Sequence, residues 1–157
     1  MSESLHVLII EDSELDAKVI EGLLKAGGYD VTARRVETSA QMNEELNTGL
    51  FDVILADYNL PEFSAPEALR LLQENGRDLP FIVISGGIGE DMAVKVMKSG
   101  AHDYLMKGNL ARLVPAVERE VREARERAAL RDAEASLQAA AEQMRIARDI
   151  QQRLFPE

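Results

Sequence analysis

The stretch LHVLIIED, residues 5–12, decides the fold, because six mostly apolar residues suited to a strand are followed at once by two carboxylates, Glu11 and Asp12. Similar runs recur along the first 110 residues, at positions 31–36, 53–56, 81–84 and 104–106. The most continuous of these runs indicate strands buried on both faces, as in a parallel sheet covered by helices. We therefore predict an α/β fold with a doubly wound five-stranded parallel sheet.

The segments between the runs are predicted to be helices. Apolar residues recur there three and four positions apart, as in Leu15, Val19 and Leu23, which is typical of an amphipathic helix. The pairs Gly27-Gly28, Asn75-Gly76 and Ser99-Gly100 fall where these helices should end.

Polar residues follow four of the five predicted strands. They are Glu11 and Asp12, then Asp57, Ser85 and Lys107. In open parallel sheets, ligands bind beyond the carboxyl ends of the strands, so we expect these side chains to gather at one edge. Three carboxylates beside a lysine and a hydroxyl form a divalent-metal site next to a nucleophile, which suits phosphoryl chemistry.

Each of these residues also has an ordinary structural explanation. Asp12 or Ser13 would suit the N-terminal cap of the first helix, and Ser85 the cap of the helix after the fourth strand. Lys107 alone is an ordinary surface lysine, and Tyr104 alone is a core aromatic residue. Their joint order and spacing favour the functional interpretation.

Composition excludes several classes of protein. The chain of 157 residues has no cysteine, which rules out disulfides and thiol chemistry. Its net charge is −10, and residues 1–106 hold eight Lys/Arg against 19 Asp/Glu, which argues against direct nucleic-acid binding. No run approaches the roughly 20 apolar residues of a membrane span, and the first residues lack the basic region of a secretory signal. We expect a soluble, cytoplasmic protein that binds no membrane.

Four motifs make residues 4–125 resemble the receiver domain of bacterial two-component response regulators (CheY-like): LIIEDS at 8–13, ADYNLP at 56–61, VISG at 83–86 and DYLMK at 103–107. The resemblance implies a flavodoxin-like strand order of 2-1-3-4-5. It implies a response regulator that accepts a phosphoryl group from a sensor histidine kinase or a phosphotransfer protein. It also implies a protein that catalyses only its own phosphorylation and dephosphorylation.

The resemblance further assigns a role to each site residue. Asp57 is the implied phospho-acceptor, and Glu11, Asp12, Asp57 and the backbone carbonyl of Asn59 are the implied ligands of Mg²⁺, with Mn²⁺ as the alternative ion. Lys107 and Ser85 are expected to stabilise the phosphoryl group. Ser85 and Tyr104 are the implied switch residues. Their movement would alter the face formed by the fourth helix, fifth strand and fifth helix, where a homodimer is expected.

Two positions depart from the common pattern. Receivers often have a proline after the lysine, with a cis bond, whereas Gly108 follows Lys107 in this chain. A cis bond to a residue other than proline costs roughly 2.5–4 kcal/mol, so we expect a trans bond or a more mobile loop. The longer Glu11 stands where aspartate is equally familiar, and we expect it to alter water placement rather than metal binding.

Residues 111–154 are predicted to form one long helix. From Leu130 a heptad pattern places Leu130, Leu137, Met144 and Gln151 at one core position, and Ala133, Ala140, Ala147 and Leu154 at the other. This seam favours either a dimeric coiled coil or a helix lying along a neighbouring domain. We expect residues 1–125 to be the receiver domain and residues 126–157 a helical linker.

The last residues, Ala147 to Pro156, resemble the leading segment of metal-dependent serine/threonine phosphatase domains of the sporulation kind. We therefore expect the linker to relay the receiver state toward an output domain of that kind, with a cyclic-dinucleotide synthase or a kinase as the alternative outputs.

The sequence fits three other functions less well. A phosphohydrolase of the haloacid-dehalogenase kind would carry Asp-x-Asp after its first strand, whereas Asp57-Tyr58-Asn59 follows the third. A flavodoxin-like flavin binder would bind a phosphate in the loop after its first strand. Four acidic residues lie there in this chain, and they would repel a phosphate. A degenerate receiver that serves as a docking or dimerisation module would lack part of the site.

Overall fold

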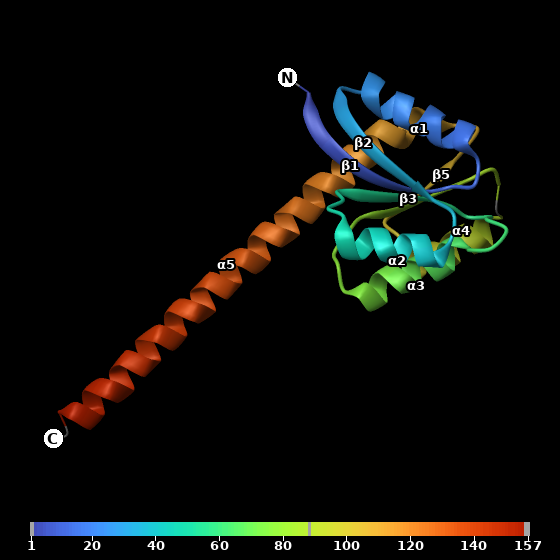
Figure 1. Cartoon of the computed structure of the whole chain (residues 1–157). Coiled ribbons are helices and arrows are strands. Elements are labelled where there is room, and N and C mark those ends of the chain that lie inside the picture. Colours follow the sequence, from blue (N-terminus) through green and yellow to red (C-terminus); the bar gives the residue numbers. More distant parts are fainter. Residues whose placement is uncertain (1, 88, 156–157) are drawn as a thin grey trace. The chain divides into compact units, whose positions relative to one another are not determined.

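The computed structural model describes residues 2–87 and 89–155, so Pro156 of the tail motif lies outside the described residues. The predicted α/β fold is confirmed, with strands and helices alternating along the chain (Figure 1). The strands are β1 (Glu3–Ile10), β2 (Tyr29–Val36), β3 (Val53–Asp57), β4 (Phe81–Ser85) and β5 (Asp103–Met106). The helices are α1 (Glu14–Ala26), α2 (Ser39–Thr48), α3 (Ala65–Asn75), α4 (Glu90–Lys98) and α5 (Leu113–Leu154).

The five strands form one parallel sheet in the order β2-β1-β3-β4-β5, as predicted. The order reverses between β1 and β3, which makes their carboxyl ends the expected place for a ligand. Ile10 pairs with Ala56 and Asp57 pairs with Ile84, so the ends of the three central strands lie level with one another.

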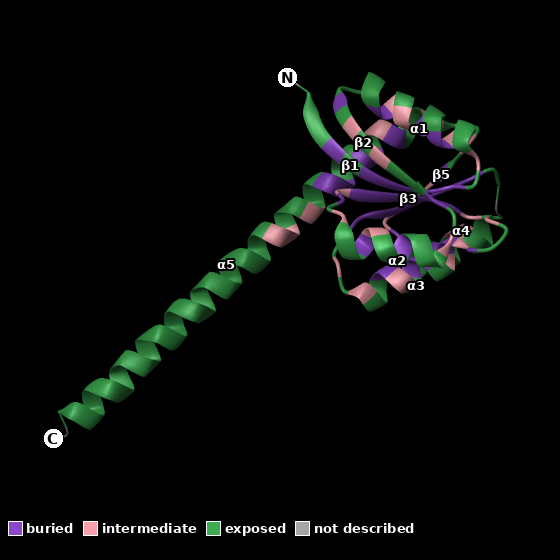
Figure 2. Cartoon of the chain, viewed as in Figure 1, coloured by how far each residue is buried: buried purple, intermediate pink, exposed green. Residues whose placement is uncertain are grey.

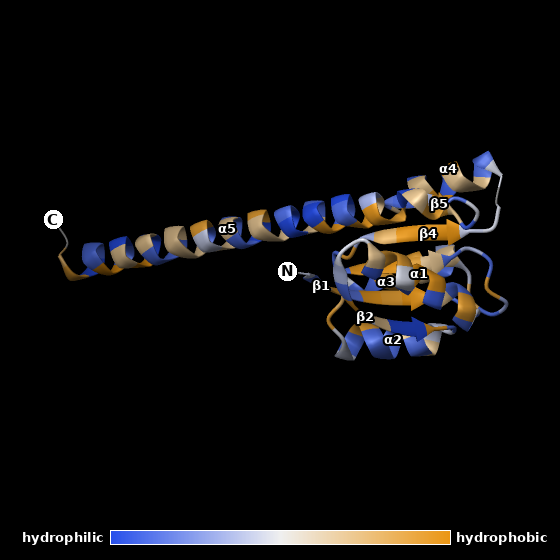
Figure 3. Cartoon of the chain, turned by 90° about the horizontal axis from the view of Figure 1, so that it is seen from above, coloured by the Kyte–Doolittle hydropathy of each residue, from blue (hydrophilic) through white to orange (hydrophobic). Residues whose placement is uncertain are grey.

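Helices cover both faces of the sheet with apolar side chains. One face of the sheet packs on α2, α3 and α4 through residues such as Met42, Leu69 and Val96. The other face packs on α1 and the first turns of α5 through residues such as Leu24 and Val117. Figure 2 shows the resulting band of buried residues along the central strands, and Figure 3 shows that the same strands are the most apolar part of the domain.

The strand β2 is less buried than the central strands. Every residue of β3 and β4 is buried, whereas the middle of β2 is exposed or half-buried. Its position at the edge of the sheet explains this difference, because an edge strand has a neighbour on one side only. Its central arginines, Arg34 and Arg35, fit that exposed position.

Short sequence signals set the helix boundaries. Ser13, Thr38 and Ser64 cap α1, α2 and α3, each accepting a hydrogen bond from the backbone N–H three residues later. The helix α3 ends at the predicted Asn75-Gly76 pair, where Gly76 has φ +82°, a left-handed conformation that favours glycine. Ser85 does not cap α4, because Gly89 occupies that position.

A short 3₁₀ turn, Leu110–Arg112, leads into the 42-residue helix α5, which fits the prediction of one long helix. The chain separates into two compact units, residues 1–122 and 123–157. In the second unit, all described residues from 129 onward are exposed, including Leu130, Leu137 and Met144. Within the described part of the chain, no helix combines the length and apolar character that a membrane span requires.

Candidate functional site

The sheet register brings the predicted site residues to one edge. Backbone hydrogen bonds continue the ladders just past the ends of the strands, from Glu11 N to Val36 O at 3.1 Å and from Lys107 N to Ser85 O at 2.8 Å. Because these residues follow neighbouring parallel strands, their side chains lie around the same carboxyl edge. The predicted gathering of Glu11, Asp57 and Lys107 is thus present in the structure.

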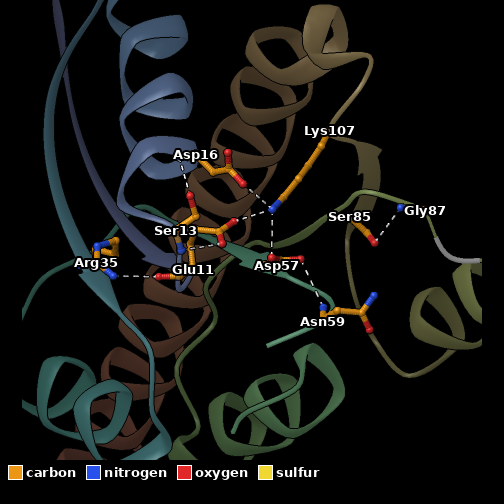
Figure 4. A network of polar contacts seen from close by, with 9 residues as sticks. All are labelled: Glu11, Ser13, Asp16, Arg35, Asp57, Asn59, Ser85, Gly87 and Lys107. Atoms are coloured by element: carbon orange, nitrogen blue, oxygen red, sulfur yellow. Dashed lines mark hydrogen bonds and ion pairs between the residues drawn. The ribbon is translucent and has the colours of Figure 1, made fainter. Parts of the chain in front are cut away.

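The ammonium group of Lys107 is the centre of this cluster (Figure 4). Its Nζ lies 3.0 Å from Oε2 of Glu11, 3.0 Å from Oδ2 of Asp57 and 2.8 Å from Oδ2 of Asp16. Sequence reasoning missed the role of Asp16 as a partner of Lys107. The available signal was its position three residues after the capping Ser13, which places it in the first turn of α1, next to the loop that carries the acid pair.

Glu11 is 1% exposed, and its carboxylate is held in place from two sides. The N–H of Ser13 donates to Oε1 at 3.1 Å, and Lys107 pairs with Oε2. Burial raises the pKa of Glu11 from 4.5 to about 7, and the nearby carboxylates of Asp12 and Asp57 act in the same direction. The Ser13 N–H and Lys107 offset only part of this increase, so Glu11 is a carboxyl group that titrates near neutral pH.

The protonated, positively charged form of Lys107 is strongly favoured. Burial by itself would lower its pKa, but the hydrogen bonds to Asp16, Glu11 and Asp57 outweigh burial and hold the pKa above its ordinary value. Lys107 therefore remains a fixed positive charge next to the Asp57 carboxylate.

Asp57 is 8% exposed at the end of β3 and uses both carboxylate oxygens. Oδ2 faces Lys107, and Oδ1 accepts a hydrogen bond from the backbone N–H of Asn59 at 3.3 Å. This bond holds the Asn59 N–H beside the carboxylate. Asp12 is exposed at the rim of the site.

Glu11, Asp12 and Asp57 could together hold a metal ion. Each offers a carboxylate oxygen, and these three oxygens lie within 4.8 Å of one another. An all-oxygen donor set with several carboxylates fits Mg²⁺ or Mn²⁺. The trio carries three negative charges when ionised, and Lys107, which also pairs with Asp16, supplies a single positive charge, so a divalent cation would offset most of the remaining negative charge.

Ser85 and Tyr104 lie on the neighbouring strands β4 and β5. Ser85 is fully buried, and its Oγ accepts a hydrogen bond from the N–H of Gly87 at 3.3 Å. Tyr104 is half-buried and packs against the core on the side of α2, α3 and α4. The Lys107-Gly108 bond is trans, since the described residues include no cis peptide bond.

Arg35 is a second residue that sequence reasoning did not single out. Its guanidinium donates to the backbone carbonyl of Glu11 at 3.2 Å and pairs with the carboxylate of Glu37. It thereby anchors the loop after β1 from the edge strand β2 (Figure 4). An exposed arginine on an edge strand gives no sequence signal for such a role.

Comparison with known proteins agrees with this geometry. Residues 7–118 match the family model of the response regulator receiver domain. The cell cycle transcriptional regulator CtrA of Caulobacter vibrioides is 35% identical over 104 residues, which are 66% of this chain and 44% of CtrA. The chain therefore spans less than half the length of this curated relative.

Solved receiver structures are similar over the same region. The receiver domain of the sensor histidine kinase PA1611 from Pseudomonas aeruginosa, solved with a magnesium ion coordinated in its active-site cleft, is 29% identical. Its TM-score is 0.63, covering 75% of this chain and 98% of that one. The N-terminal domain of a response regulator/sensory box/GGDEF 3-domain protein from Carboxydothermus hydrogenoformans is 25% identical, with a TM-score of 0.67 over 78% and 98% of the two chains.

The family match, the strand order and the acidic edge of the sheet agree. This chain belongs to the response regulator receiver domain family.

Proposed function

We propose that Asp57 accepts a phosphoryl group from the phosphohistidine of a sensor histidine kinase or a phosphotransfer protein. The observation that carries this proposal is the position of the Asp57 carboxylate at the end of β3, with Lys107 Nζ at 3.0 Å and the Glu11–Asp12 pair beside it. In the transfer, an Asp57 oxygen forms a bond to phosphorus as the bond between phosphorus and the histidine nitrogen breaks.

The residues around Asp57 fit this reaction. Lys107 is held charged and would neutralise negative charge on the transferring group. Glu11, Asp12, Asp57 and the Asn59 carbonyl would hold Mg²⁺ or Mn²⁺, which when bound supplies further charge neutralisation on the phosphoryl oxygens. The backbone N–H of Asn59 holds one oxygen of Asp57 and so orients the carboxylate.

Phosphorylation would then act as a switch through Ser85 and Tyr104. New phosphoryl oxygens offer acceptors to the Ser85 hydroxyl, which in the present state accepts from the Gly87 N–H. Movement of Ser85 toward them would open space on the side of the half-buried Tyr104 ring. The face formed by α4, β5 and α5 would change as a result, and we propose this face as one site of homodimer contact.

We further propose that residues 1–125 act as the receiver domain and residues 126–157 as a helical linker toward an output domain. The exposed seam of Leu130, Leu137 and Met144 supports a coiled coil with a second copy of the chain. The resemblance of residues 147–156 to the leading segment of a sporulation-type phosphatase supports a protein phosphatase as the output.

The reaction is tested by treating the chain with acetyl phosphate and Mg²⁺ and measuring its intact mass. We expect a gain of one phosphoryl group in the native chain and none after Asp57→Asn. Asp91→Asn, which removes an exposed carboxylate from the first turn of α4, is the matched control and should still be labelled. Label that persists in Asp57→Asn would refute the assignment.

The linker proposal is tested by disulfide cross-linking of two single-cysteine variants, which is clean because the chain has no cysteine of its own. Leu137→Cys lies on the seam, and Gln138→Cys lies one position away from it. We expect a higher yield for Leu137→Cys and a change in that yield on phosphorylation. Equal yields at the two positions would contradict a coiled coil in this register.

A further inference from the structure

In this structure the Lys107 ammonium group donates hydrogen bonds to Asp16 and Asp57 and forms an ion pair with Glu11. A lysine ammonium has three N–H donors. Three carboxylate oxygens surround Nζ, at 3.0 Å from Glu11, 3.0 Å from Asp57 and 2.8 Å from Asp16. A phosphoryl group formed on Asp57 would bring further oxygens to the same place, so it would compete for these donors.

Asp16 differs from the other two partners in its surroundings. Its side chain is 44% exposed, compared with 2% for Glu11 and 8% for Asp57. It is also outside the trio of Glu11, Asp12 and Asp57, whose oxygens lie within 4.8 Å of one another. Asp16 is therefore the partner that can return to water most easily, since it neither lies deep in the site nor belongs to the metal-capable set.

The local structure holds Asp16 in place and leaves it room to move. The N–H of Asp16 donates to the Ser13 side chain at 3.2 Å, which fixes its backbone in the first turn of α1. A small pocket of about 80 Å³ adjoins the ion pair, lined by Asp16, Val19, Ile20, Ile84, Lys107 and Leu110. Because its side chain is 44% exposed, the carboxylate can turn away from Lys107 toward solvent while the helix stays fixed.

We propose that Asp16 is a positioning residue that competes with the phosphoryl group for Lys107, so that this ion pair slows the phosphorylation of Asp57. The inference rests on the proposed function and adds a control to the same site. Asp16 touches neither phosphorus nor the attacking oxygen, and it acts by occupying one donor of the lysine that the reaction needs.

The main test compares initial rates of phosphorylation of the full 157-residue chain by acetyl phosphate with Mg²⁺. Asp16→Asn should raise the rate up to about fivefold, the fold-change that corresponds to releasing Lys107 from a partly exposed ion pair of roughly 1 kcal/mol. Asp16→Glu restores a carboxylate with a longer reach and should return the rate to near the native value.

Glu14→Gln provides the matched control. Glu14 also lies in the first turn of α1, and its replacement by glutamine removes the same charge as Asp16→Asn. Its carboxylate pairs with Lys18 at 3.5 Å rather than with Lys107. We expect its rate to stay within about twofold of native, because its charge is exposed and screened. An equal gain in Glu14→Gln and Asp16→Asn would overturn the inference in favour of general repulsion of the acidic donor.

A double-mutant cycle with Lys107→Met tests whether Asp16 acts through the lysine. Asp16→Asn should give no gain once Lys107 is absent, and a gain of the same size in that background would overturn the inference. Label on Asp57 in the native chain is the positive control for the proposed function itself. A native chain that takes no label would refute the proposed function. A native chain that is labelled, with Asp16→Asn labelled at the same rate, would refute only the role of Asp16.

Discussion

Replacement of Glu11 by glutamine should make the domain more stable at alkaline pH and change its stability little at acid pH. Glu11 is almost fully buried, and burial raises its pKa from 4.5 to about 7. Glutamine has the same shape as the protonated carboxyl group and cannot ionise. The substitution therefore removes the titration and keeps one oxygen that can accept from the Ser13 N–H, while the second position carries N–H donors, as it carries an O–H in the protonated acid.

The size and the sign of the effect follow from linkage. Below pH 4.5, Glu11 is protonated in both the folded and the unfolded chain, and its titration does not affect stability. Between pH 4.5 and about 7, the unfolded chain releases its proton while the folded chain keeps it, so stability falls as the pH rises. Above about pH 7 the full penalty is present. At about 1.4 kcal/mol per pH unit, it amounts to about 3 kcal/mol.

The assay is urea unfolding of the native chain and Glu11→Gln in the absence of divalent ions, from pH 5 to pH 8. The free energies of unfolding should diverge by about 3 kcal/mol toward pH 8, with Glu11→Gln the more stable. Two curves that stay parallel across this range would refute the argument that burial sets the pKa of Glu11.

Three further predictions concern packing, capping and charge, each measured as the free energy of unfolding in urea. Lys107→Met should destabilise the domain by about 2 kcal/mol. This is less than the roughly 3–5 kcal/mol lost on breaking a fully buried ion pair, because the Lys107 side chain is 27% exposed. Equal stability of the two proteins would show that the ion pairs of Lys107 contribute nothing. Ser13→Ala should cost about 1 kcal/mol by removing the cap of α1, and a loss below a few tenths would contradict that role. Leu8→Ala should cost about 2–5 kcal/mol, because Leu8 is 0% exposed in β1, one of the three inner strands of the sheet. A loss near zero would place it outside the core.

The sequence carried enough information to predict the fold because its signals are local. The continuous apolar runs of β3 and β4 mark strands buried on both faces, and the boundaries of α1 and α3 follow from Ser13, Ser64 and Gly76. The edge strand β2 was the exception. Its burial depends on having one neighbouring strand instead of two, and a strand's neighbours are a property of the assembled sheet.

The residues of the candidate site also fall into a group that the sequence could predict and a group that it could not. Residue types at strand ends were sufficient to predict that Glu11, Asp57, Ser85 and Lys107 lie at one edge, because parallel strands in register bring their ends together. The roles of Asp16 and Arg35 could not be predicted, since each depends on where a side chain from another element reaches across the loop after β1.

The sequence by itself therefore determined the alternation of strands and helices, the family of the domain and the identity of the acidic trio. The tertiary structure alone decided which carboxylates share Lys107 and why Glu11 has a pKa of about 7. The physical reason is that apolar periodicity and helix capping act between residues close in the chain. Burial and ion pairing depend on distances between residues such as Asp16 and Lys107, which are 91 positions apart.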